Sequence, residues 1–305
     1  MSNLETLQKH NTDLQNLIEK AESLPEKGDF GKQVDGIIDR SITEISNSSV
    51  TSIGEYAFYK CTKLASVNIP NATYIGRNAF DNCVALKSAN IPNATDIEGD
   101  AFQSCTVLTS VNIPKATSIS GNMFSRCTYL TSVDFPNATS IGSYAFYECK
   151  ALTSASIPNA TSIDRHAFYT CYELASVNFP NVTSIGASAF NSCYKLMRAD
   201  FAKMTSIGSD AFQHCYSITA IILRSETMCT LPSTSTFNWC YHILGTVRDP
   251  YNPNGDKDGY FYVPRALVED YKVATNWSSF STQFRALEDY TVDGTITGEL
   301  DPNKI

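Results

Sequence analysis

Ten cysteines give this chain its greatest potential for chemistry, and eight of them recur at intervals of 22 residues. Each of the eight ends a nine-residue pattern that reads IGEYAFYKC at 53–61 and IGSDAFQHC at 207–215. The regular cysteines are Cys61, Cys83, Cys105, Cys127, Cys149, Cys171, Cys193 and Cys215. Thiols at a fixed period could form disulfides or sense oxidants, but they could also fill a core, because a free cysteine behaves as a small apolar residue.

The spacing of the cysteines favours a core column over disulfide bridges. Equivalent side chains in neighbouring coils of a stacked repeat lie about 4.8 Å apart. A disulfide needs its β-carbons at roughly 3.5–4.5 Å with a specific torsion angle. We therefore expect a structural column of reduced, buried thiols, with bridging or redox sensing as the alternative.

The four histidines provide no recognisable catalytic set. No Ser–His–acid or Cys–His combination stands at a motif spacing, and the acidic residues are scattered singly. The one grouping of metal-binding residue types comprises His214, Cys215, Cys229, Cys240 and His242. Zinc requires four ligands with recognisable pair spacing, and Cys215 already belongs to the repeated column. We expect no catalytic residue, no cofactor and no metal.

A second candidate for metal binding is the stretch NGDKDG at 254–259, which imitates the start of an EF-hand loop. An EF-hand places a bidentate glutamate at the twelfth position of its loop, and Arg265 stands there instead. The stretch therefore predicts a turn rather than a calcium site.

The residues around each cysteine form one coil of a repeat. The spacing Leu64-x-x-Val67-x-Ile69 is typical of a leucine-rich repeat strand. Pro70 then ends the strand ladder, because proline has no amide hydrogen to donate. In the AFxxC portion, apolar residues three or four positions apart predict a short helix whose N-cap is the slot of Gly54. No coil can bury its apolar side alone, so the stacked coils must share one core.

The frame LxSVxIPNATSIGxxAFxxC resembles the BspA-like (Treponema-type) leucine-rich repeats of bacterial surface and host-associated proteins, over roughly residues 42–245. The resemblance implies an α/β solenoid, a right-handed leucine-rich repeat of about eight 22-residue coils with degenerate coils and caps. Residues 261–289 resemble the C-terminal capping segment of the same family. There we expect a strand at Tyr260–Val263 and an amphipathic helix that ends at Trp277.

The predicted domain organisation has five parts. Residues 1–24 form an amphipathic helix, 25–36 a polar linker, 37–245 the solenoid, 246–289 the capping segment and 290–305 a tail that we expect to be poorly ordered.

The N-terminal helix carries an a/d heptad series with an asparagine at one a position, a device that fixes register in coiled coils. The series is Leu4, Leu7, Asn11, Leu14, Ile18 and Ala21. Three heptads are marginal on their own, so two alternatives stay open. The helix either associates with its copies through residues 4–21 to form a homo-oligomer, or lies on the first coil.

Composition and charge exclude several classes of partner. The net charge of −8 and pI near 5.0 argue against nucleic acid and anionic membranes. No stretch approaches the eighteen apolar residues that a membrane span requires, so we expect no membrane insertion. Acids and amides stand where a signal peptide would carry its apolar core, so we expect none. The family resemblance implies a cell-surface or extracellular location, and a virion is the alternative.

Five asparagines in the slot after the proline head N-x-T sequons. They are Asn71, Asn93, Asn137, Asn159 and Asn181. Because asparagine in such a slot can bond its own backbone, we expect turn residues rather than glycosylation sites.

Two sets of side chains interrupt an otherwise uniform surface of Ser, Thr and Asn, and they are our candidates for ligand binding. Tyrosines on the helical side combine a large contact area with a low entropy cost. The candidates are Tyr169, Tyr172, Tyr194 and Tyr216 on the helical side, and Met197, Arg198 and Asp200 on the strand side. We expect the two sets on different sides of the solenoid, and Ile222 is a further change on the strand face. The alternative is that the rings only pack along its edge.

These observations favour a non-enzymatic binding or adhesion scaffold that presents its repeat surface to a protein or glycan on a cell surface. The alternative is a phage or prophage tail-associated receptor-binding protein with an N-terminal oligomerisation helix. An enzyme is the third and least favoured class.

Overall fold

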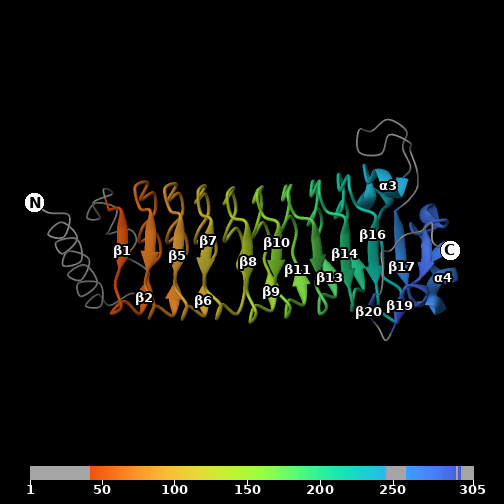
Figure 1. The fold of residues 1–305 in the computed structure, drawn as a ribbon, viewed down its shortest axis with the longest axis horizontal. Coiled ribbons are helices and arrows are strands. Elements are labelled where there is room, and N and C mark those ends of the chain that lie inside the picture. Colours follow the sequence, from red (N-terminus) through yellow and green to blue (C-terminus); the bar gives the residue numbers. More distant parts are fainter. Residues whose placement is uncertain (1–41, 245–258, 293–294, 297–305) are drawn as a thin grey trace, which may run out of the picture.

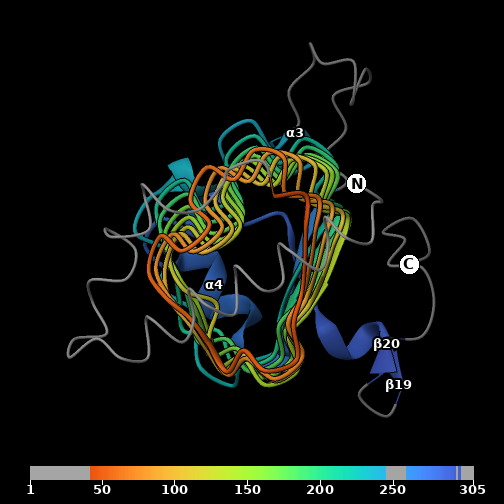
Figure 2. The same cartoon turned by 90° about the vertical axis from the view of Figure 1, so that its left-hand side faces the viewer.

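The computed structural model describes residues 42–244, 259–292 and 295–296, and these form a parallel β-solenoid of about ten turns (Figure 1). Viewed along the solenoid, the coils superpose around a common interior (Figure 2). The predicted fold class is therefore confirmed. The predicted N-terminal helix and linker, the heptad series and the EF-hand-like stretch lie outside the described residues, apart from Gly259.

Each coil contributes one strand of three or four residues to the first sheet. These strands are β1 (Glu44–Ser46), β3 (Ser66–Asn68), β5 (Ser88–Asn90), β7 (Ser110–Asn112), β8 (Ser132–Asp134), β10 (Ser154–Ser156), β12 (Ser176–Asn178), β14 (Arg198–Phe201) and β16 (Ala220–Leu223). They pair in parallel in three successive ladders, β1-β3-β5-β7, β8-β10 and β12-β14-β16, which we together call the first sheet. Ser66 lies opposite Ser88, one repeat later. The strand position predicted from Leu64 to Ile69 is therefore correct.

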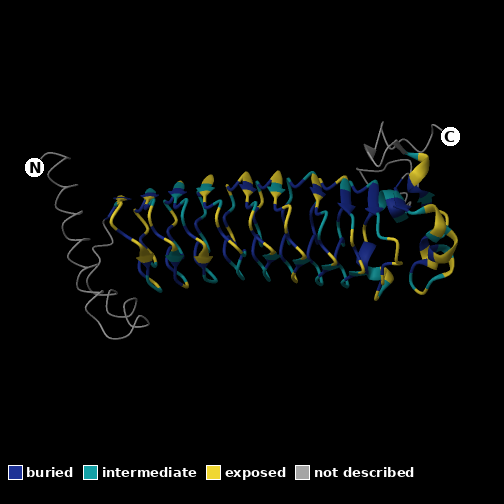
Figure 3. Ribbon diagram, turned by 90° about the horizontal axis from the view of Figure 1, so that it is seen from below, coloured by how far each residue is buried: buried dark blue, intermediate teal, exposed yellow. Residues whose placement is uncertain are grey.

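A second, shorter strand follows the proline of most coils. These strands are β2 (Ser52–Ile53), β4 (Tyr74–Ile75), β6 (Asp96–Ile97), β9 (Ser140–Ile141), β11 (Ser162–Ile163), β13 (Ser184–Ile185) and β15 (Ser206–Ile207). Inward isoleucines alternate with exposed or partly exposed residues in these strands. The same alternation of buried and exposed positions runs through the coils (Figure 3). Both strands therefore turn one face to the shared core.

The helix predicted in the AFxxC portion is wrong, because this portion consists of consecutive turns. Tyr56 and Lys60 have φ angles of 55° and 57°, and equivalent residues in the following coils are also left-handed. A right-handed α-helix has negative φ angles throughout, so it cannot include these left-handed residues. The N–H of Phe58 donates across to Ala79 in the next coil at 2.8 Å, whereas that of Cys61 donates back to Phe58 at 3.0 Å. Bonds between coils thus replace helical bonds within one coil.

A column of phenylalanine rings runs through the core of the solenoid. Successive ring centroids lie 5.1–5.8 Å apart with interplanar angles of 4–14°. The column consists of Phe58, Phe80, Phe102, Phe124, Phe146, Phe168, Phe190, Phe212 and Phe237. Stacked aromatic pairs stabilise beyond their buried area, so the column ties each coil to the next.

All ten cysteines are buried and free. The thiol of Cys149 donates to the carbonyl oxygen of Phe124 in the preceding coil at 3.1 Å, and the same bond recurs from Cys83 through Cys215 and at Cys240. The cysteine therefore contributes a hydrogen bond as well as apolar packing, and alanine in the same position could not form this bond. Burial raises the pKa of the Cys149 thiol well above its usual range.

The chain after the repeats closes the C-terminal end of the core. β17 (Tyr260–Val263) pairs with β16, and β18 (Phe284–Ala286) pairs with β17, both in parallel. Between these strands lie η2 (Arg265–Leu267), α4 (Val268–Val273) and η3 (Ser278–Phe280). The strand was predicted correctly, but the helix ends at Val273, because the extended backbone of Ala274 (ψ 149°) breaks it before Trp277.

Hydrogen bonds from this segment satisfy backbone groups of the irregular coil, which contains η1 (Thr234–Phe237) and α3 (Tyr241–Leu244). The indole N–H of Trp277 donates to the carbonyl of Cys229 at 2.8 Å, and the hydroxyl oxygen of Tyr271 accepts the N–H of Cys229 at 2.6 Å. The amide of Gln283 donates to the carbonyl of Ile243 at 2.8 Å. We infer that residues 260–289 act as a cap, because they supply partners that the next coil would otherwise provide.

The end of the capping segment packs on the outward side of the last strands. η4 (Leu287–Asp289) is followed by β19 (Thr291–Val292) and β20 (Thr295–Ile296), which pair antiparallel. In Figure 2 they lie outside the outline of the coils. The described part of the tail thus forms a small ladder, and its other residues lie outside the described part of the chain, so the expectation for the tail stays a prediction. The division of the chain into five domains stays a prediction.

One buried carboxyl makes solenoid stability pH-dependent. Asp81 is 5% exposed, and burial together with the nearby charge of Asp100 raises its pKa from 3.8 to about 6. The folded state then binds the proton more tightly than the unfolded chain, so stability is greatest at low pH and falls as the pH rises from about 4 to about 6. Asp81→Asn is expected to raise the free energy of unfolding by about 1–3 kcal/mol at pH 7.

Urea unfolding of both proteins at pH 7 and pH 3.5 checks this expectation. The gain should be present at pH 7 and nearly absent at pH 3.5, where the wild-type carboxyl is protonated when folded. An equal gain at both pH values would show that the substitution acts through packing and not through charge.

Candidate functional site

The tyrosines singled out by the sequence divide into two arrays in the structure. The first occupies the slot directly after the repeated cysteine in four successive coils. It consists of Tyr172, Tyr194, Tyr216 and Tyr241, which we call the tyrosine row. Its last member begins α3 at the upper edge of the solenoid in Figure 1. Earlier coils carry threonine, valine or lysine in this slot, so the row is confined to the C-terminal half.

The rings of the tyrosine row stack on one another. Successive centroids are 4.6, 4.8 and 5.1 Å apart, and the interplanar angles are 12–21°. All four residues are partly exposed. Because the coils fix the backbone beneath them, the rings are held in place before any partner arrives.

Tyr169 does not belong to the tyrosine row. It stacks on Tyr147 at 5.3 Å and lies beside His166, whose ring stacks on Tyr144 at 4.7 Å. The guanidinium of Arg165 lies over the Tyr144 ring at 5.6 Å. These residues form a separate aromatic cluster over two coils, so the structure does not bring Tyr169 together with the other three predicted tyrosines.

Sequence reasoning missed two aromatic residues at the C-terminal end of the row. Trp239 is 53% exposed and stacks on His214, with centroids 5.8 Å apart. Tyr241 contacts both Tyr216 and Trp239. The signal was present, because Trp239 and Tyr241 flank Cys240 as His214 and Tyr216 flank Cys215. The 25-residue spacing of this last copy obscured the correspondence.

Other exposed apolar side chains lie between the repeated cysteine and the following strand. Seven large apolar residues are exposed in the described part of the chain, and three of them stand there. The three are Val84, Tyr129 and Met197. Met197 follows Tyr194 by three residues through one turn. The expectation that the two predicted sets lie on different sides of the solenoid stays a prediction.

Arg198 and Asp200 form an ion cluster with Arg224. The Asp200 carboxylate is 8% exposed and accepts a bond from Arg198 at 2.9 Å and two bonds from Arg224 at 2.8 Å. A buried carboxylate held by two guanidinium groups has its acceptor capacity largely used. We infer that Asp200 orders this strand face and that Met197 is its more accessible member.

The strand face beyond this cluster is covered by η4 and Tyr290. Ile222 and Tyr262 are fully buried, and Leu287 packs against them to form a small second core. Ile222 is therefore part of the interior, contrary to its reading as a surface landmark. The exposed strand face ends where η4 covers it.

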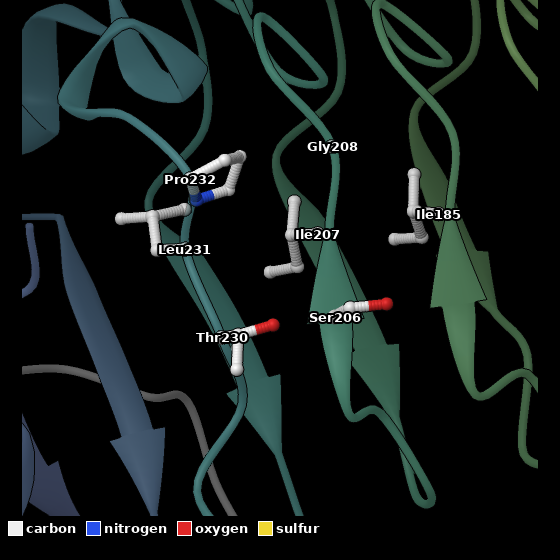
Figure 4. A pocket seen from close by; sticks show the side chains of 7 residues that line it. All are labelled: Ile185, Ser206, Ile207, Gly208, Thr230, Leu231 and Pro232. Carbon is white, nitrogen blue, oxygen red and sulfur yellow. The ribbon is translucent and has the colours of Figure 1, made fainter.

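A hollow of about 390 Å³ opens beside the second sheet (Figure 4). It is lined by Ile185, Ser206, Ile207, Gly208, Thr230, Leu231 and Pro232. At this point the irregular coil replaces a regular strand by a single bridge between Ser206 and Thr230. The lining contains no ionisable side chain, so the hollow offers packing space rather than acid–base chemistry.

Within the described residues, no three His, Cys, Asp or Glu side chains come together in a way that could hold a metal. The same part of the chain includes no helix with the length and apolarity that a bilayer crossing demands.

The sequon asparagines hold neighbouring coils together. Asn93 donates to the carbonyl of Pro70 at 2.8 Å, and Asn159 donates to that of Pro136 at 2.7 Å. The same type of bond recurs at Asn71, Asn137 and Asn181. Their partners lie in the preceding coil. The prediction that each asparagine bonds its own backbone is therefore wrong, because these bonds join neighbouring coils.

Comparison with known families gives a match to the BspA type Leucine rich repeat region, in six copies over residues 39–150 and 139–247. No curated protein matches the chain.

Several solved structures are similar at 28% identity. A leucine-rich repeat protein from Bacteroides ovatus covers 61% of this chain with a TM-score of 0.47, and the match spans 56% of that protein's length. The Treponema pallidum leucine-rich repeat protein covers 51%, over 72% of its own length, with a TM-score of 0.43. A leucine-rich cell surface protein from Faecalibacterium prausnitzii covers 65%, over 77% of its own length, with a TM-score of 0.31.

Proposed function

The chain belongs to the BspA-type leucine-rich repeat family, and on that premise we propose that it is a non-enzymatic scaffold that binds a protein or glycan on a cell surface through its tyrosine row. The observation that carries the proposal is the stack of four partly exposed rings in successive coils. Leucine-rich repeat proteins generally present extended surfaces for binding.

The rest of the solenoid surface supports this choice of site. Along the first sheet, neighbouring coils present the same small polar side chains, and Asn68, Asn90 and Asn112 already bond one another. A ligand on such a surface could slide by one coil at little cost. The tyrosine row interrupts this uniformity, and tyrosine is enriched where partners dock because it adds contact area and a hydroxyl group.

Truncation of two central rings tests the proposed function. Tyr172→Ala with Tyr194→Ala is expected to weaken binding by about 1–2 kcal/mol per ring, because each truncation removes contact area while the core beneath stays intact. The measurement is a screen of glycans and cell surfaces with the wild type and the double variant. Tyr59→Ala, a partly exposed tyrosine in the first coils, serves as the control and should bind like the wild type. Equal binding by all three proteins would show that the rings only pack along the edge.

The heptad series favours a second candidate function, a phage or prophage tail-associated receptor-binding protein that assembles through residues 4–21. Deletion of residues 1–24 should convert an oligomer to a monomer with an unchanged unfolding midpoint, because the series lies outside the repeats. Light scattering at tens of micromolar checks this expectation. A full-length chain that is already monomeric would remove the support for this candidate.

A further inference from the structure

The period of the tyrosine row restricts which extended ligands can lie along it. The two steps of 4.6 and 4.8 Å from Tyr172 to Tyr216 span about 9.4 Å, and a polyproline II helix advances about 9.3 Å in one turn of three residues. The steps of 4.8 and 5.1 Å from Tyr194 to Tyr241 span about 9.9 Å, again close to one polyproline turn. Every third residue of a polyproline II helix would therefore lie opposite every second ring of the tyrosine row.

Other extended conformations fit this period less well. A β-strand repeats its side chains on one face at about 6.6–6.8 Å, which matches neither one coil nor two. An α-helix rises about 5.4 Å per turn, so it would lose register by more than half an ångström on most coils. Rigid spacing of the rings makes such a mismatch costly, because the coils beneath cannot stretch to follow the ligand.

The chemistry of the row suits a polyproline backbone. The faces of the inner rings are covered by their neighbours, so the row offers ring edges and hydroxyl groups, of which that of Tyr216 also bonds to Nδ1 of His214 at 3.3 Å. A polyproline II segment has no internal hydrogen bonds, and its carbonyl groups are available to hydroxyl donors. Burial and the neighbouring Tyr194 raise the pKa of Tyr172, so its hydroxyl keeps its proton at neutral pH.

A positive charge lies at one end of the tyrosine row and distinguishes it from the other end. The ammonium group of Lys150, in the same slot one coil earlier, lies 5.8 Å from the centre of the Tyr172 ring. Lys150 forms no ion pair within the described residues, whereas nearby Lys195 pairs with Glu173 at 2.6 Å. An acidic residue next to the polyproline segment could therefore form an ion pair with Lys150 at this end of the row.

We propose that the ligand of the tyrosine row is a proline-rich polypeptide segment in the polyproline II conformation, lying along the solenoid with an acidic residue near Lys150. This inference rests on the proposed function and names its partner class. Polyproline segments are low-entropy ligands that dock on aromatic surfaces of other proteins.

The test uses full-length protein and a fluorescent ten-residue proline peptide with one terminal aspartate. Fluorescence anisotropy should show binding of this peptide at least tenfold tighter than that of a glycine–serine peptide of equal length and charge. Tyr194→Ala should raise the Kd about tenfold, Tyr194→Phe should raise it less, and Lys150→Glu should raise it for the aspartate peptide but not for a neutral one. Tyr59→Ala is the matched control, and thermal unfolding of each variant confirms that it is folded.

Equal binding of the proline and glycine–serine peptides would overturn the proposal, and so would unchanged binding by Tyr194→Ala. A glycan that binds the row in the surface screen while the proline peptide does not would also overturn it. That last result would leave the proposed function intact, whereas loss of all binding at the row would remove both.

Discussion

Replacing Trp277 with alanine is expected to lower the free energy of unfolding by about 3–5 kcal/mol. The indole is 1% exposed and donates its N–H to the carbonyl of Cys229. Its ring lies 5.3 Å from both Tyr271 and Phe261 and 6.0 Å from Phe237, the last ring of the core column. The substitution removes the transfer energy of the ring, leaves a cavity and strands a buried carbonyl group.

Urea unfolding of the wild type, Trp277→Ala and Val273→Ala measures this loss. Val273 belongs to the neighbouring helix but is 80% exposed, so its substitution should change stability by no more than about 0.5 kcal/mol. Because the end of a stacked repeat exposes an apolar face when its cap is weakened, Trp277→Ala should also aggregate at lower temperature. A loss no greater than that of the Val273 control would contradict the role of 260–289 as a cap.

The second large effect concerns thiol reactivity. In the folded protein, the cysteine column should react with a thiol reagent at least about a thousandfold more slowly than in denaturant, because labelling requires the core to open. Two features of the structure support this. All ten thiols are buried. Burial raises the pKa of Cys229 to about 12 and raises the pKa values of Cys127 and Cys171 well above their usual range. Because only the thiolate reacts, both features slow the reaction.

Mass spectrometry after timed labelling distinguishes the individual cysteines. Those of the first and last coils should label first under mild denaturant, because a solenoid opens from its ends. Rapid labelling of Cys127 and Cys149 in native buffer would contradict the inward placement of the column. A mass loss corresponding to disulfides in the purified protein would instead support the bridging alternative.

The repeat could be predicted from the sequence because its apolar residues and cysteines recur every 22 residues. A 22-residue spacing of Leu64, Val67 and Ile69 equivalents can be satisfied only if the coils stack in register, which fixes the strand pairs and the inward cysteines. The capping strand at Tyr260–Val263 was predictable from the resemblance of residues 261–289 to the capping segment of the family.

The turns could not be predicted from the same pattern. Ala57, Phe58 and Cys61 have the spacing of one helical face, but consecutive turns bring the same three residues inward. The deciding feature is the left-handed backbone at Tyr56 and Lys60. The residues in these two slots include Asn, Asp, Ser, His and Arg, so no single residue type marks the conformation.

The candidate site was predictable only in part. The period placed Tyr172, Tyr194 and Tyr216 in one slot, but it could not show that Tyr169 stacks elsewhere. The burial of Asp200 and Ile222 depends on Arg224 and on η4. Neither contact recurs at the 22-residue period, so the repeat carries no signal for them.

The most direct test of the account compares the two faces on which a ligand could bind. The partner recovered from the surface screen is titrated against wild type, against Tyr172→Ala with Tyr194→Ala, and against Ser132→Arg with Ser154→Arg, which places bulk on the exposed first sheet. We expect the tyrosine variant to bind at least tenfold more weakly and the serine variant to bind like the wild type. Loss of binding in the serine variant, with unchanged binding in the tyrosine variant, would place the ligand on the strand face and contradict the account.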